Sequence, residues 1–400
     1  MRLEVYPRVY YELLSIGFMV IMSISLSSAF LPIMAHKLDP TGSLVGLALS
    51  SWFLTRIFIE VPSGLISAKV GRRNLIVRGI LLGILGSLLC ALSNSIYILI
   101  LGRTLWGFGT ALYFTSNTAL MLDLFNPEVR GRAMGVFQGI CFLGSFLGAP
   151  LGAVLARFIG FNAVFVVATV VVLPAFLVAF FSKDLRGMDR AARREHETVP
   201  IRNIITSLND PALLGVCYVN LSRMLVAQGV MSTVFQLYLN ETLGIAVELI
   251  GLTLAVRTIS MISMVVLSGY LADRLGSELV VLLGLAINAL GQGLYPLASS
   301  FEQILPLAII ESAGGGFLFT SLIVYLSDLV SPSLRGGAVG LFRTFMDLGG
   351  ILGPIAFMLI YNGLGPHTSF WLASAMLTSN IVIISLIKMR RRVDNLSEFK

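Results

Sequence analysis

Six stretches of the chain, each at least 23 residues long, contain no Lys, Arg, Asp or Glu. They are residues 13–35, 79–102, 133–156, 158–182, 279–301 and 348–387. An α-helix needs about 20 mainly apolar residues to cross the hydrocarbon core of a bilayer. Closed β-barrels are the only other spanning solution, and the sequence lacks the alternation of barrel strands. The long uncharged runs therefore predict an all-α membrane protein.

The composition agrees with this class and argues against several others. Of the 400 residues, 56% are hydrophobic and 12% are charged, whereas a soluble domain carries about 25% charged residues. The net charge of +7 could suggest nucleic-acid binding, but that function needs a basic face on a soluble fold. The three cysteines lie in apolar segments, and the three histidines are far apart without ligand spacing. We therefore expect no nucleic-acid partner, disulfide, metal site or cofactor.

Pro, Gly, Asn and charged residues divide the chain into twelve predicted spans. The spans are residues 12–35, 44–68, 75–94, 97–122, 133–156, 162–182, 211–239, 247–272, 279–298, 303–327, 336–361 and 369–388. The only long polar segment follows the sixth span, where residues 183–202 contain ten charged residues. This division predicts an N-terminal six-helix bundle in 1–182, a charged cytoplasmic linker in 183–210 and a C-terminal six-helix bundle in 211–400.

The distribution of Lys and Arg predicts the orientation. With the N-terminus inside, cytoplasmic segments hold 21 of the 28 Lys and Arg residues, outer loops hold two, and five lie within spans. Cytoplasmic loops of membrane proteins carry such an excess of positive charge. The first apolar segment is also too long for a signal-peptide core, which favours a retained helix. We therefore expect a multi-pass plasma membrane protein with both termini in the cytoplasm.

The two halves of the sequence are related by a shift of 205 residues. Residues 114–148 match 319–353 without a gap, with 15 identities in 35 positions. The matches include Asp, Pro and Arg in register, which chance agreement between apolar segments does not produce. Both halves run the same way through the membrane, and such parallel repeats are a recurring architecture of transporters.

The loops after the second and eighth spans carry a matching motif. Its residues are Gly64, Lys69, Gly71 and Arg72 in the first half, and Gly269, Asp273, Arg274 and Gly276 in the second. This motif resembles the loop signature G-x-x-x-D-R-x-G-R-[RK] of the major facilitator superfamily. In that family the basic residues pair with an acid at the end of the fourth or tenth helix, and Asp123 and Asp328 occupy those positions. The resemblance implies the major facilitator fold of twelve helices in two pseudo-symmetric bundles.

The sequence departs from this motif at two positions. Ala68 stands where the first half should carry Asp, and Ser277 replaces the Arg of the second half. We therefore expect the latch that closes the cytoplasmic side to be divided between the halves.

Two further patterns resemble the proton-linked members of the superfamily. The fourth span contains Arg103-x-x-x-Gly107-x-Gly109, similar to the pattern of the fourth helix in those members. The fifth span contains the glycine-proline pattern common in the antiporters, namely Gly144, Gly148, Pro150 and Gly152. Small residues at this spacing also serve plain helix packing in lipid, so both interpretations of the fifth span stay open.

Charges inside membrane spans cost about 2.5–3.5 kcal/mol each and are functional candidates. The carboxylates are Glu60, Glu311 and Asp347, which we consider candidate proton carriers. Arg56 with Glu60 and Arg343 with Asp347 have the i,i+4 spacing of internal ion pairs. Arg103, Arg223, Arg257 and Glu311 lack such a partner in their own spans.

The resemblance implies that the first, fourth, seventh and tenth helices line a central cavity. The predicted cavity residues are Arg103, Asn117, Arg223, Gln228 and Glu311. We expect Arg103 and Glu311 to act in coupled transport, and Arg257 to matter less to substrate affinity. The first span offers no carboxylate, which departs from many multidrug exporters of the family.

These features predict a secondary active transporter of a small molecule that works by alternating access. No G-x-x-x-x-G-K-[ST] loop is present, so protons are the expected driver rather than ATP, and we expect no enzyme activity. Proton antiport that exports an amphipathic compound is the leading hypothesis. Proton symport that imports a small organic anion is the alternative, because the spans contain five Arg but only three carboxylates. A membrane enzyme or receptor on the same scaffold is a remote third, and the protein is expected to be a monomer in the lipid bilayer.

Overall fold

The computed structural model describes residues 8–125, 127–192, 211–330 and 335–398, and in these ranges all regular elements are helices. Eleven described helices are long and apolar enough to span a membrane, and Val45–Ile59 is a shorter apolar helix. Many of their large apolar side chains are exposed, among them Phe158, Val170, Val266 and Leu359. Because lipid tails solvate such side chains, the pattern confirms an all-α membrane protein.

The chain forms two compact units. Unit 1 contains residues up to Glu197 together with Ile245–Ala255, and unit 2 contains Thr198–Gly244 together with Val256 to the C-terminus. The helices of unit 1 are α1 (Arg8–Ser25), α2 (Leu31–Leu38), α3 (Val45–Val70), α4 (Arg72–Ala91), α5 (Ile96–Leu124), α6 (Pro127–Ile159), α7 (Phe161–Phe181) and α8 (Lys183–Ala192). The helices that come later in the chain are α10 (Pro211–Leu225), η1 (Val226–Val234), α11 (Phe235–Leu237), η2 (Tyr238–Thr242), α12 (Val247–Leu275), α13 (Ser277–Leu294), η3 (Tyr295–Leu297), α14 (Phe301–Leu329), α15 (Arg335–Leu364) and α16 (Pro366–Glu398). The first turns of α12 belong to unit 1 and the rest of this helix belongs to unit 2.

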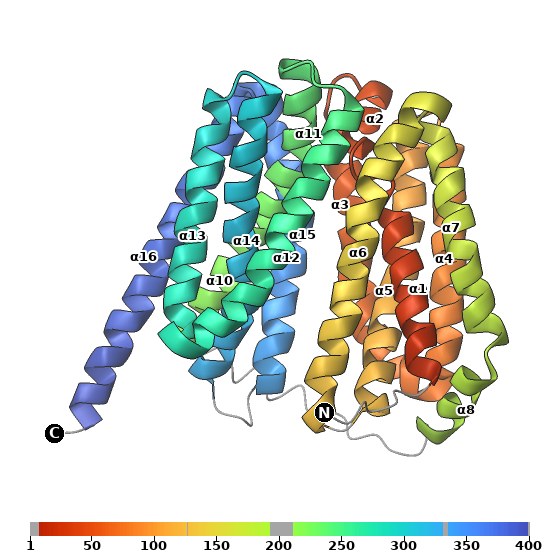
Figure 1. Ribbon diagram of the computed structural model, residues 1–400, viewed down its shortest axis with the longest axis horizontal. Coiled ribbons are helices and arrows are strands. Elements are labelled where there is room, and N and C mark those ends of the chain that lie inside the picture. Colours follow the sequence, from red (N-terminus) through yellow and green to blue (C-terminus); the bar gives the residue numbers. More distant parts are fainter. Residues whose placement is uncertain (1–7, 126, 193–210, 331–334, 399–400) are drawn as a thin grey trace. The chain divides into compact units, whose positions relative to one another are not determined.

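In unit 1, α1 packs against α6 and α7, and α4 packs between α5 and α7 (Figure 1). The shared core contains Tyr10, Leu13, Ile80 and Tyr113, all of them buried. In unit 2, α13 lies between α14 and α16, and α10 packs on α15. The last turns of α16 extend past the neighbouring ends of α13 and α14 (Figure 1).

Glycines allow helix backbones in both units to approach closely, and they do so at positions 205 residues apart. A Cβ atom on Gly79 of α4 would lie 2.6 Å from the Gly109 carbonyl oxygen of α5. At the equivalent place in unit 2, a Cβ atom on Gly314 would lie 2.7 Å from the Gly284 oxygen. Small residues at helix interfaces permit this close van der Waals packing in lipid. The sequence repeat therefore corresponds to a repeated helix contact.

The glycines of the predicted fifth span pack α6 onto α1. Cβ atoms on Gly144 and Gly148 would each lie 2.8 Å from a carbonyl oxygen of α1, those of Phe18 and Met22. A Cβ atom on Gly152 would overlap the carbonyl oxygen of Leu26, the residue directly after α1. In unit 2, Gly349 and Gly353 of α15 approach the backbone of α10 in the same way, with carbonyl oxygens at 2.5 and 2.6 Å. Close packing thus accounts for these glycines, while a role specific to antiport stays a prediction.

Three segments differ from the expected spans. The first span, predicted over 12–35, is interrupted between α1 and α2. There the hydroxyls of Ser27 and Ser28 donate hydrogen bonds to the backbone carbonyls of Ile24 and Ser25, and such local bonds compete with the helix. The seventh span contains π-helical turns in η1 and η2, where Thr233 Oγ1 donates to the Gln228 carbonyl at 2.8 Å. The start of the expected linker forms helix α8, which is held to unit 1 by the buried side chain of Leu185. The rest of that linker lies outside the described residues.

Asp39 lies at the start of the loop between α2 and α3. Its carboxylate accepts hydrogen bonds from Thr41 Oγ1 at 2.6 Å, from Ser43 Oγ at 3.2 Å and from the Leu44 backbone N–H at 2.7 Å. Burial by itself raises the pKa of Asp39, but these hydrogen bonds together lower that pKa below its ordinary value. The ionised carboxylate therefore stabilises the start of α3.

We expect Asp39→Ala to lower the free energy of unfolding by about 1 kcal/mol at pH 7, as for the loss of a helix cap. Because the folded-state pKa of Asp39 is depressed, its contribution is present above the unfolded pKa of about 3.9 and is lost as the pH falls through the folded pKa. Thermal unfolding of wild type and variant in detergent, from pH 7 to pH 3, measures this difference. A gap in melting temperature that stays constant over this range contradicts the assignment.

Substitution of Gly152 tests the backbone contact between α6 and Leu26, the residue directly after α1. Gly152→Ala places a methyl group on the Leu26 carbonyl, so we expect a loss of about 3 kcal/mol or more in stability. Gly139→Ala in the same helix is the matched control, because no atom lies within 4 Å of its added Cβ. Equal melting temperatures of the two purified variants would show that the contact does not contribute.

Candidate functional site

A buried ion pair joins α12 to α14 in unit 2. The Arg257 Nη2 and Nε atoms donate to Glu311 Oε2 at 2.8 and 3.0 Å. Glu311 is only 4% exposed. A charged pair at this depth is costly to desolvate, and removing one partner leaves the other charge uncompensated. Among the described ion pairs, this one is the most buried.

Two uncharged polar residues, Asn288 of α13 and Tyr295 of η3, lie close to the pair. Asn288 Nδ2 donates to the Glu311 backbone carbonyl at 2.9 Å and approaches its Oε1 at 3.4 Å. The Tyr295 hydroxyl and both amide atoms of Gln292 are buried without a hydrogen-bond partner in the described part of the chain. The Phe235 ring centroid lies 5.6 Å from the Arg257 guanidinium carbon. Unused donors and acceptors close to a buried ion pair can accept water, a proton or a polar ligand group.

Unit 1 carries no such pair at the equivalent positions. A shift of 205 residues places Trp52 at the position of Arg257 and Trp106 at the position of Glu311. Trp52 lies on α3 and Trp106 on α5, helices that pack against each other as α12 and α14 do. In unit 1 the equivalent helices thus pack with aromatic residues at these two positions, so the packing of α3 on α5 does not require charges there.

Arg257 has a partner that its own helix does not supply, while its expected smaller effect on substrate affinity stays a prediction. Glu311 has no partner within its own helix, as the sequence indicates, but its carboxylate is held by Arg257 from α12. The two residues are 54 positions apart, and helical spacing within a single span cannot reveal such a pair.

Arg103 on α5 is a second candidate, and it has no carboxylate partner among the described residues. Its side chain is 7% exposed, its Nε atom is buried without a hydrogen-bond partner, and its guanidinium carbon lies 5.9 Å from the Trp106 ring. Further along α5, both amide atoms of Asn117 and the hydroxyl of Tyr113 are also buried without a partner in the described structure. Both predicted cavity residues of this helix, Arg103 and Asn117, therefore carry unused polar groups.

Arg223 on α10 is held by a neutral side chain. Its Nη2 and Nε atoms donate to Asn220 Oδ1 at 3.0 and 3.3 Å. Gln228, the remaining predicted cavity residue, lies in the π-helical segment η1.

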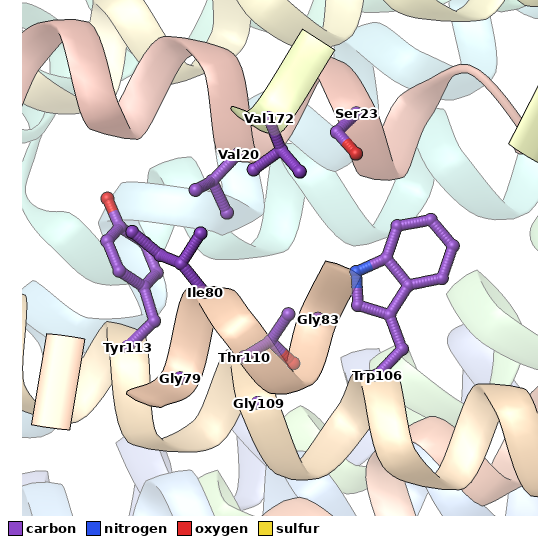
Figure 2. Close-up of a pocket in the computed structure, with 10 residues that line it drawn as sticks. All are labelled: Val20, Ser23, Gly79, Ile80, Gly83, Trp106, Gly109, Thr110, Tyr113 and Val172. Carbon is purple, nitrogen blue, oxygen red and sulfur yellow. The ribbon is translucent and has the colours of Figure 1, made fainter. Parts of the chain in front are cut away.

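Unit 1 also contains a small cavity of about 10 Å³ between α1, α4, α5 and α7. Figure 2 shows its lining, with Val20 and Ser23 from α1, Ile80 from α4 and the Trp106 indole from α5. This volume matches about one water molecule. The cavity is too small to hold a transported solute.

The other two candidate proton carriers are Asp347 and Glu60. Asp347 on α15 is 2% exposed, whereas Arg343 is exposed, and the described ion pairs do not include the expected one between them. The side chain of Glu60 lies outside the described residues, so the expected pair with Arg56 does too. The Arg56 guanidinium carbon lies 4.9 Å from the Trp52 ring.

The loop motif is partly described. Gly71 and Gly276 both have positive φ, +95° and +88°, directly before α4 and α13, a conformation that favours glycine. Ser277 Oγ donates to Asp328 Oδ2 at 2.6 Å, so the residue that replaces the expected Arg still contacts the acid of the motif. Arg274 lies 4.4 Å over the Tyr270 ring. The side chains of Gly64 to Lys69, Asp123 and Asp273 lie outside the described residues, while Arg72 is buried.

Sequence reasoning missed the uncharged residues beside the pair, Asn288 and Tyr295, and it missed the buried Gln292 one turn beyond Asn288 on α13. A usable signal existed, because Asn288 and Gln292 are polar residues with i,i+4 spacing inside an otherwise apolar run. Search by charge alone passes over such residues.

Comparison with known proteins identifies the family. The model of the Major Facilitator Superfamily matches residues 13–228 and 217–398, so the chain belongs to this superfamily of transporters. Among its relatives are Tetracycline resistance protein, class H, of Pasteurella multocida, with 24% identity over 92% of this chain and 94% of the relative, and Multidrug resistance protein MdtG of Citrobacter koseri, with 25% identity over 93% of each. The crystal structure of the nucleoside transporter NupG has the same fold, with a TM-score of 0.77 and 12% identity over 94% of this chain and 99% of that chain.

Proposed function

We propose that this major facilitator protein is a proton-coupled antiporter that exports an amphipathic compound by alternating access. The observation that carries the proposal is the buried Arg257–Glu311 pair, with Nη2 to Oε2 at 2.8 Å. Its equivalents in unit 1 are Trp52 and Trp106, which indicates that the charges serve function rather than folding. The resistance proteins among the relatives, at 22–25% identity, support export as the direction.

Glu311 is the proposed proton carrier and Arg257 its counter-charge. While Glu311 is ionised, it accepts both hydrogen bonds from Arg257. Protonation removes the negative charge and leaves Arg257 without its ionic partner, so the proton changes the free energy of this contact between α12 and α14. A conformational change driven by protons requires such a difference in free energy between two states.

Import of a small organic anion by proton symport is the second candidate function. It is favoured by Arg103, a buried cation with no described carboxylate partner. The direction of flux under an imposed pH gradient separates symport from antiport.

We also propose that the protein acts as a monomer in the plasma membrane with both termini in the cytoplasm. The excess of Lys and Arg in the loops on that side supports this orientation. A reporter fused to the C-terminus and active only in the cytoplasm tests it.

In reconstituted vesicles, we expect Glu311→Gln to reduce proton-driven flux of the transported compound to the level of protein-free vesicles. Glutamine keeps the shape of the side chain but cannot exchange a proton at physiological pH. Uptake into inside-out vesicles after an imposed pH jump measures this flux, with protonophore as the zero reference. Arg103→Ala is expected to abolish coupled flux as well while the protein stays folded.

The matched control is Glu302→Gln, which removes an exposed carboxylate from the first turn of the same helix. It should transport at the wild-type rate. Near-normal proton-driven flux from Glu311→Gln removes Glu311 from the mechanism and leaves the pair as a structural contact.

A further inference from the structure

Arg223 has an arrangement that differs from that of Arg257. Asn220, which is fully buried, accepts two hydrogen bonds from the Arg223 guanidinium through Oδ1. The same amide donates through Nδ2 to the Phe342 carbonyl of α15 at 3.0 Å. Asn220 is therefore fixed from two sides, and it fixes the direction of the Arg223 side chain.

This contact orients the cation without neutralising it. A guanidinium has five N–H donors, and Asn220 accepts from only two of its nitrogen atoms. Within the described residues, Arg223 forms no ion pair, whereas the Arg257 guanidinium has a carboxylate oxygen at 2.8 Å. The full positive charge of Arg223 and its outer donors thus remain available to another molecule.

The depth of Arg223 limits what that molecule can be. Arg223 lies twelve residues from the start of α10 at Pro211, which corresponds to about 18 Å along a helix. The hydrocarbon core is about 30 Å thick, so this position lies deeper than the phospholipid headgroups. A charge at this depth costs free energy unless an opposite charge lies beside it. A transported solute is the class of partner that can supply this opposite charge.

We propose that Arg223, oriented by Asn220, binds the anionic group of the transported compound, a carboxylate, sulfonate or phosphate. The planar donor fork of arginine fits two oxygens of such a group. This inference rests on the proposed transport function and names the class of its substrate: an amphipathic compound whose polar end is negatively charged.

Asn220→Asp provides a sharp test, because it places a carboxylate where an oxygen already contacts the guanidinium at 3.0 Å. The new ion pair neutralises Arg223 without removing it. Arg223→Gln removes the charge itself, and Arg343→Gln is the matched control because it removes an exposed arginine from α15. Thermal unfolding without ligand shows whether each variant is folded.

The probes are three aromatic acids, each paired with its neutral primary amide: benzoate with benzamide, 2-naphthoate with 2-naphthamide, and biphenyl-4-carboxylate with its amide. Their dissociation constants are measured from the rise in melting temperature of the full-length protein in detergent. We expect wild type and Arg343→Gln to bind at least one acid about tenfold or more tightly than its amide, and both Arg223→Gln and Asn220→Asp to lose this preference.

Absence of a preference for the acid in all three pairs overturns the proposal, and so does a preference that survives in both Arg223→Gln and Asn220→Asp. The measurement uses no pH gradient, so its outcome does not depend on Glu311. Loss of proton-driven flux in Glu311→Gln with an intact acid preference would support both proposals. An intact flux in Glu311→Gln with the same acid preference would reject the proton carrier alone.

Discussion

The close approach of helix backbones at glycines determines how both units of this protein pack. Lipid offers no hydrophobic drive between helices, so association depends on van der Waals contact. Gly79 with Gly109 in unit 1, and Gly284 with Gly314 in unit 2, allow these contacts at positions 205 residues apart. Because the contacts occur twice, the two units share one packing scheme. Differences between their side chains can then be interpreted against a common backbone.

The main difference lies in the charge of the side chains at equivalent positions of the two units. At equivalent positions, unit 1 has Trp52 and Trp106 and unit 2 has Arg257 and Glu311. Asn288 stands where unit 1 has Gly83, and it adds a hydrogen bond to the Glu311 carbonyl. Replacing a buried ion pair by apolar residues of similar volume is often neutral or stabilising. A buried pair in only one of the two repeats is therefore the basis of our proposal that these charges serve transport rather than packing.

Much of the fold could be predicted from the sequence, because uncharged runs, loop charges and the 205-residue repeat each depend on local composition. The interruption between α1 and α2 could not, since it depends on which serine hydroxyls bond to the backbone. Glu311 and Arg223 were found because charges are rare in membrane spans. Their hydrogen-bond partners could not be predicted equally well from the sequence. Asn220 shares a helix face with Arg223, whereas the partner of Glu311 comes from a helix 54 residues away in sequence.

The central claim is that the Arg257–Glu311 pair serves proton coupling and not folding. The most direct test is the double variant Arg257→Met/Glu311→Met, which replaces both charges by apolar side chains of similar size. Its melting temperature and its solute flux under a pH gradient are measured beside those of Arg257→Met alone, in the same detergent and vesicles. The account predicts that the double variant is at least as stable as the single variant, because no buried charge is left uncompensated, and that its flux no longer responds to the pH gradient. Flux that still follows the pH gradient, or a double variant less stable than Arg257→Met, would contradict it.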